Sequence, residues 1–110
     1  MAKLPSAPAH LSRDARAFWR AVLRDYDLDA GGLRLLQGAC EALDRTAEAR
    51  AAIDQDGAYL PDRFGQIKAH PGLSVERESR AQFERHLRAL GLDGADEYVP
   101  PSRLPERGRS

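Results

Sequence analysis

The sequence has little of several features that mark particular classes of protein. Its single cysteine, Cys40, excludes a disulfide framework or a thiolate metal cluster within one chain and favours a reducing, intracellular setting. No apolar run approaches the roughly 18 residues of a membrane-spanning helix, and the N-terminus has no apolar signal-peptide core. Aromatic residues make up only 6% of the chain, so the core is built mostly from Leu and Ala. We therefore expect a soluble, cytoplasmic protein that makes no membrane contact.

The length and the charge balance narrow the possibilities further. A chain of 110 residues forms one domain, with a modest core that favours packing between subunits. The 17 basic and 17 acidic residues cancel, which excludes a uniformly basic nucleic-acid coat protein. The balance nevertheless hides a segregation. Residues 1–26 hold five basic and two acidic groups, whereas residues 27–56 hold three basic and seven acidic groups.

Apolar residues at three- and four-residue spacing predict three helices, at about residues 13–26, 30–55 and 71–91. Ser12 and Asp29 are predicted to be the N-caps of the first two helices. Gly57 and Gly91 are predicted to end the second and third helices in the left-handed conformation. Glu76 and Arg80 are spaced for an ion pair on the third helix. We expect the second and third helices to form a long antiparallel helical hairpin that makes the core.

A short β-hairpin is predicted at about residues 58–69, between the second and third helices. Two such short strands are marginally stable alone, so we expect them to lie on a helix or on another subunit. The fold class is therefore mainly α. The Pro-rich residues 1–11 form a lead, residues 12–92 the helical domain, and residues 93–110 a flexible C-terminal tail.

The first helix carries four arginines at spacings of three, four and four residues, which places them on one side. We call this row the arginine stripe; its members are Arg13, Arg16, Arg20 and Arg24. Guanidinium groups in a row suit phosphate contacts, although a solvated face of an amphipathic helix has the same pattern. Weaker candidates for DNA contact are Lys3 and Lys68. The tail arginines are a further candidate, for DNA or for a protein partner: Arg103, Arg107 and Arg109.

No pattern in the sequence predicts catalysis, a metal site or a cofactor. The three histidines lie too far apart for a ligand pair, and His10 and His70 sit at helix entries, where a hydrogen-bonding role is expected. Cys40 lies on the apolar side of the second helix and is interpreted as a small core residue. Glycine-rich phosphate loops and nucleophile elbows are absent from the sequence. The chain is therefore predicted not to be an enzyme.

Several runs of residues, in a fixed order over about residues 5–92, resemble the small terminase subunit of tailed bacteriophages. These runs are Pro8-Ala9-His10-Leu11-Ser12, Phe18-Trp19, Ala39-Cys40-Glu41-Ala42, Asp56-Gly57-Ala58-Tyr59, Gly65-Gln66-Ile67-Lys68-Ala69-His70-Pro71 and Leu90-Gly91-Leu92. The sequence departs from the family after Leu92, where an acidic stretch replaces a Thr-Pro-x-x-Arg-type turn.

The resemblance implies a non-catalytic component of viral genome packaging in the bacterial host cytoplasm. Residues 12–92 would be an oligomerisation and DNA-binding domain that forms a homo-oligomeric ring of roughly 8–10 subunits. The ring would bind double-stranded viral DNA and present it to the terminase large subunit, which carries the ATPase and the nuclease. Two alternatives stay open. One is a helix-turn-helix regulator, although the acidic second helix argues against a role as a DNA-recognition helix. The other is a helical adaptor whose arginines pair with acidic protein surfaces.

Overall fold

The computed structural model describes residues 4–92 and is mainly α-helical. In chain order its elements are α1 (Arg13–Asp25), α2 (Ala30–Asp56), β1 (Tyr59–Pro61), β2 (Ile67–Ala69) and α3 (Gly72–Leu90). The predicted fold class is confirmed, and every predicted helix end lies within one residue of the observed end. Lys3 and the tail at residues 93–110 lie outside the described residues.

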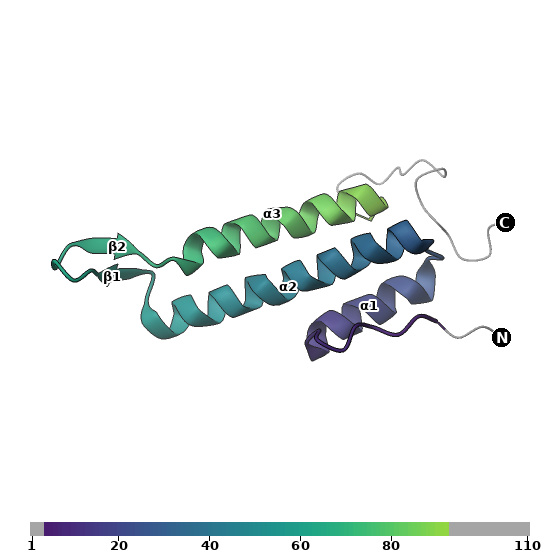
Figure 1. Ribbon diagram of the computed structural model, residues 1–110, viewed down its shortest axis with the longest axis horizontal. Helices are drawn as coiled ribbons and strands as arrows, with labels where there is room; N and C mark the ends of the chain where they lie inside the picture. Colours follow the sequence, from purple (N-terminus) through teal and green to yellow (C-terminus); the bar gives the residue numbers. More distant parts are fainter. Residues whose placement is uncertain (1–3, 93–110) are drawn as a thin grey trace.

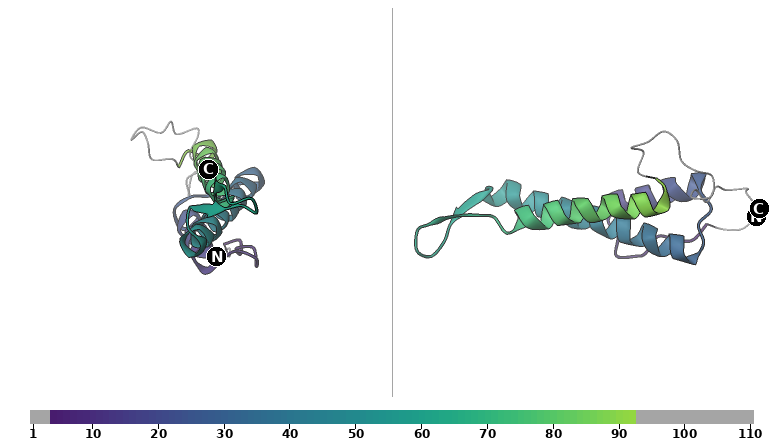
Figure 2. Two further views of the ribbon diagram at one scale, coloured as in Figure 1. Left: turned by 90° about the vertical axis from the view of Figure 1, so that its left-hand side faces the viewer. Right: turned by 90° about the horizontal axis from the view of Figure 1, so that it is seen from above.

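The two long helices, α2 and α3, run antiparallel and pack side by side (Figure 1). Helix α1 packs on the N-terminal part of α2. The β-hairpin projects from the other end of the molecule, beyond the C-terminal end of α2 and the N-terminal end of α3. Figure 2 shows the same arrangement from above and from one end. The molecule measures 62 × 30 × 19 Å. The arginine-bearing helix and the β-hairpin therefore lie at opposite ends of an elongated molecule.

Local capping interactions explain where the helices begin and end. The Ser12 side chain accepts a hydrogen bond from the backbone N–H of Ala15, and Asp29 accepts one from Gly32, so both predicted N-caps are confirmed. Gly91 has the predicted left-handed conformation. The prediction for Gly57 is wrong in one respect. Its φ is positive, at 87°, but its ψ of 150° is extended, because the chain passes directly from α2 towards β1.

Most of the large buried apolar side chains lie at the end of the molecule where α1 packs on α2, and Ile53, near the C-terminal end of α2, is an exception. This cluster comprises Leu11, Ala15, Trp19, Val22, Leu23, Leu36, Cys40 and Leu90. Towards the hairpin, the buried residues of α2 and α3 are mostly small, as at Ala42, Ala49 and Ser79. The predicted packing of α2 on α3 is confirmed. The prediction that these two helices alone make the core is incomplete, because α1 supplies half of the residues of this cluster.

A buried ion pair joins α2 to α3 in the half of the molecule where apolar side chains are small. Glu76 is only 8% exposed and accepts hydrogen bonds from Arg50 Nε at 2.8 Å and Arg50 Nη2 at 2.7 Å. Arg80 Nη2 lies 3.3 Å from the same carboxylate, which confirms the predicted pair within α3. The hydrogen bonds from Arg50 hold the pKa of Glu76 below its usual value.

Two histidines have the hydrogen-bonding roles predicted from their places at helix entries. His10 Nε2 lies 2.8 Å from a carboxylate oxygen of Glu41 on α2. His70 is buried, its Nδ1 accepts a hydrogen bond from the backbone N–H of Gly72, and its Nε2 lies 2.9 Å from Asp56. His70 therefore connects the end of α2 to the start of α3.

Cys40 is expected to be chemically inert in the folded protein. Its side chain is fully buried, with Sγ 3.4 Å from the backbone carbonyl oxygen of Ala15, which confirms the prediction of a core residue. Burial, together with the charges of Asp44 and Glu41, raises the pKa of Cys40 to about 12. The reactive thiolate is therefore disfavoured at neutral pH. We expect no reaction with a thiol reagent at pH 8 without denaturant and complete reaction in denaturant. Rapid reaction of the native protein would contradict the buried position.

Candidate nucleic-acid interface

The arginine stripe lies along one side of α1, as its spacing predicts. The opposite part of the helix buries Ala15, Trp19 and Leu23 against the core. Three members of the stripe are exposed, and Arg16 is half-buried. The structure therefore brings all four predicted arginines together on one surface.

Few negative charges lie near this surface. The two acidic residues of α1, Asp14 and Asp25, are eleven residues apart and share a side of the helix away from the stripe. Among residues 4–92, no carboxylate forms an ion pair with Arg13 or Arg20. The positive charge of these two side chains is therefore available to a ligand.

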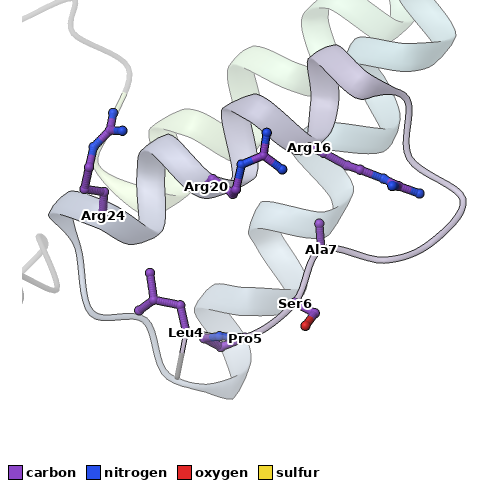
Figure 3. Close-up of a pocket in the computed structure, with 7 residues that line it drawn as sticks. All are labelled: Leu4, Pro5, Ser6, Ala7, Arg16, Arg20 and Arg24. Atoms are coloured by element: carbon purple, nitrogen blue, oxygen red, sulfur yellow. The ribbon is translucent and has the colours of Figure 1, made fainter. Parts of the chain in front are cut away.

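The chain that precedes α1 runs beside this helix and borders an open groove (Figure 3). The groove has a volume of about 580 Å³ and is lined by Leu4, Pro5, Ser6, Ala7, Arg16, Arg20 and Arg24. A second hollow of about 410 Å³ adjoins it and is lined by Leu11, Arg13, Arg16 and Arg20. Arg16 and Arg20 therefore border both hollows.

Specific contacts hold this leading segment in place. The indole N–H of Trp19 donates a hydrogen bond of 3.0 Å to the carbonyl oxygen of Pro5, and Arg16 donates one to the carbonyl oxygen of Ala9. Asp44 on α2 accepts hydrogen bonds from both the backbone N–H and the hydroxyl of Ser12. The wall of the groove is therefore fixed to both α1 and α2.

The contribution of residues 4–7 to the groove is not predicted from the sequence, where residues 1–11 are expected only to form a Pro-rich lead. The one available signal was Trp19, since a buried indole N–H needs an acceptor. Arg16 also has a role that its spacing does not indicate. Its guanidinium group is partly engaged with the Ala9 carbonyl, whereas Arg13 and Arg20 are not tied to the lead by any described hydrogen bond.

The weaker cationic candidates do not extend the stripe. Lys68 lies on β2, at the opposite end of the molecule, with its Nζ 3.7 Å from Asp62. The remaining candidates are outside the described residues: Lys3, Arg103, Arg107 and Arg109.

A different side of the molecule is acidic. A hollow of about 280 Å³ is lined by His10, Glu41, Asp44, Arg45 and Glu48, where the leading segment meets α2. Hydrogen bonds from Gln37 and then from His10 hold the pKa of Glu41 below its usual value. Carboxylates that stay ionised repel phosphates, so α2 is a poor recognition helix for DNA. This argues against the helix-turn-helix arrangement.

The described part of the chain offers little else for chemistry. Residues 4–92 contain no group of three or more His, Cys, Asp or Glu side chains placed to hold a metal ion. None of the helices in this range combines the length and the apolar character that a membrane span requires.

Comparison with known proteins identifies the family. The family model for the phage terminase small subunit matches residues 15–99, which is more than three quarters of the chain. The match includes α2, the β-hairpin, α3 and all of α1 except its first two residues. Searches of curated proteins and of solved structures gave no match. The small subunit is the non-catalytic partner in the terminase, in agreement with the prediction that the chain is not an enzyme. The chain therefore belongs to the phage terminase small subunit family.

Proposed function

We propose that the chain binds double-stranded viral DNA through the arginine stripe and presents it to the terminase large subunit during genome packaging. In this proposal it acts as a homo-oligomeric ring in the cytoplasm of the bacterial host. The observation that carries the proposal is the row of four arginines that borders two hollows on one side of α1, with Arg13 and Arg20 in no ion pair with a carboxylate among residues 4–92.

The dimensions of α1 suit the DNA backbone. Arg13 and Arg24 are eleven residues apart, so the stripe extends over about 16 Å of helix. That length corresponds to the axial rise of about five phosphates of one strand. Guanidinium groups donate charge-assisted hydrogen bonds to phosphate oxygens. Contacts of this type position a protein on DNA but do not read its sequence, so binding through the stripe is expected to be independent of sequence.

Oligomerisation would convert weak contacts into firm binding. Three or four phosphate contacts by a single subunit bind weakly at physiological salt. Copies held in one ring would engage the same DNA molecule together, and the later contacts would form at high effective concentration. A small subunit without chemistry of its own is suited to this holding role, while the large subunit acts on the DNA.

Filter binding to double-stranded DNA over a salt series tests the DNA-binding part of the proposal. Three or four phosphate contacts predict that the logarithm of the binding constant falls with the logarithm of salt concentration with a slope of about −3 per engaged subunit. The adaptor alternative predicts no salt-dependent DNA binding.

Native mass spectrometry tests the ring. An assembly of many subunits supports the proposal, a monomer contradicts it, and a dimer favours the regulator alternative.

A further inference from the structure

Residues 93–99, which we call the acidic segment, come directly after Leu92, the last residue that the structure describes. The segment contains carboxylates and apolar side chains but no cation. Its carboxylates are Asp93, Asp96 and Glu97, and Tyr98 and Val99 follow them. The segment therefore carries a charge of −3 at neutral pH, and the proposed function gives it no role.

The groove beside α1 has one basic side and one apolar side. Arg16, Arg20 and Arg24 belong to α1, whereas Leu4 and Pro5 belong to the chain that precedes it (Figure 3). Leu4 is 45% exposed, so its side chain is largely uncovered. A ligand that combines carboxylates with neighbouring apolar side chains would pair with the guanidinium groups and cover the apolar side. The acidic segment has this combination.

The acidic segment begins close to the groove. Leu92 packs against the hydrophobic cluster at the α1 end of the molecule, and so does Ala7, which lines the groove. Phe18 of α1 also makes an edge contact with Phe83 of α3, with the ring centroids 5.6 Å apart. Helix α1 and the C-terminal half of α3 are therefore neighbours.

The segment is long enough to reach the groove. Extended chain spans about 3.3 Å per residue, so Asp96 can lie up to about 13 Å from Leu92 and Val99 up to about 23 Å. An α-helix with its side chains is about 10–12 Å across. The segment can therefore pass around α1 from the core side, where Leu92 packs, to the side that carries the arginine stripe.

We propose that the acidic segment occupies the groove beside the arginine stripe of its own chain and that double-stranded DNA displaces it. The inference rests on the proposed DNA-binding role of the stripe and adds a way in which that role is regulated. The carboxylates would pair with the arginines, among which Arg20 forms no ion pair with a carboxylate of residues 4–92. Tyr98 and Val99 would cover Leu4 and Pro5.

Attachment to the same chain favours this occupant over a free acidic peptide. Single exposed ion pairs contribute little, so they would not hold a separate partner. A tethered segment, in contrast, is present at an effective concentration on the order of millimolar. Carboxylates and phosphates accept the same hydrogen bonds from guanidinium groups, so the segment and DNA would compete for the stripe.

Neutralising the acidic segment tests this competition. The triple variant Asp93→Asn, Asp96→Asn and Glu97→Gln removes the charges and nearly keeps the side-chain sizes. Its affinity for double-stranded DNA should rise about 10-fold at low salt, because the stripe is no longer occupied. The gain should shrink as the salt concentration rises, since salt screens exposed ion pairs. Filter binding of the full chain measures both effects.

The matched control adds the same charge elsewhere. Glu48→Gln, Glu78→Gln and Glu84→Gln change three exposed residues of α2 and α3. This triple variant should bind DNA with nearly the affinity of the wild type. An equal gain in the two triple variants would show that net charge alone is responsible and would overturn the competition.

A pair of introduced cysteines tests the contact without DNA. Ser6→Cys lies in the wall of the groove and Ala95→Cys lies in the acidic segment, and neither substitution removes a charge. Cys40 is buried, so the two introduced thiols are the ones that should react. In a glutathione redox buffer they should form a disulfide within one chain, which denaturing electrophoresis without reductant detects. Adding the three neutralising substitutions should slow this reaction about 10-fold.

The outcomes distinguish this inference from the function on which it rests. Equal rates of disulfide formation with and without the three carboxylates overturn the contact. Disulfides between chains overturn it in favour of the acidic segment of a neighbouring copy. A charge-dependent disulfide within the chain, with no DNA binding by the wild type or the neutralised variant, supports the contact. That last result would overturn the DNA-binding function and, with it, the displacement by DNA.

Discussion

Replacing Arg13 and Arg20 together by alanine is expected to lower the affinity for double-stranded DNA by about 10- to 100-fold at low salt. Both side chains are exposed, and neither has a carboxylate partner within residues 4–92, so their charges are available to phosphates. Removing two phosphate contacts should also reduce the magnitude of the salt slope by about 2 per engaged subunit. Filter binding across a salt series measures both quantities.

The matched control removes the same charge from another helix. Arg77 and Arg85 are exposed on α3, and their double alanine variant should retain nearly the affinity and salt slope of the wild type. Equal losses in the two double variants would mean that net charge matters and the stripe does not. No loss in the Arg13 and Arg20 variant would eliminate the stripe as the DNA surface. Arg16→Ala is a less direct test, because it also removes the bond to the Ala9 carbonyl.

Glu76→Gln is expected to lower the melting temperature by at least about 5 °C at pH 7. The substitution keeps the size of the side chain but removes the charge that binds Arg50 and Arg80. It also replaces one of the two oxygens that accept from Arg50 with an NH₂ group, which cannot accept. Thermal unfolding followed by circular dichroism measures the change. Glu78→Gln is the matched control, because Glu78 is an exposed residue of the same helix. A shift in the control as large as that of Glu76→Gln would show that the ion pair is not responsible.

The stabilisation by Glu76 should depend on pH in a definite direction. Its pKa is lower in the folded protein than its ordinary value of 4.5, so the folded state holds the proton less tightly than the unfolded chain. The stability that this difference supplies is fully present above pH 4.5. It is lost as the pH falls through the lowered pKa. The gap in melting temperature between the wild type and Glu76→Gln should therefore narrow under acidic conditions.

Local features of this fold are predictable from the sequence because their causes are local. Ser12, Asp29 and Gly91 lie within a few residues of the groups that they cap, so the helix ends follow from side-chain chemistry. The arginine stripe is equally predictable, because the geometry of a helix fixes which residues share a side.

Contacts between distant segments could not be predicted in this way. The sequence indicates Glu76 with Arg80 as neighbours on one helix, and this pair exists at 3.3 Å. It gives no sign that Glu76 is buried against Arg50, which is 26 residues away. The bond between Trp19 and the Pro5 carbonyl is similar, since it depends on how the lead packs on α1. The exposure of Tyr59 and Ile67, on a hairpin that its own helices do not cover, depends on where those helices end.

The uneven distribution of large apolar side chains along the molecule has a consequence for how it unfolds. At the α1 end, stability comes from a hydrophobic cluster, which is insensitive to pH and salt. Towards the hairpin the buried apolar residues are mostly small, apart from Ile53, and the ion pair of Glu76 with Arg50 contributes, which acid weakens. We therefore expect acid to loosen the hairpin end before the α1 end, and hydrogen exchange at low pH would measure this order. The arginine stripe belongs to the end of the molecule that we expect to open last.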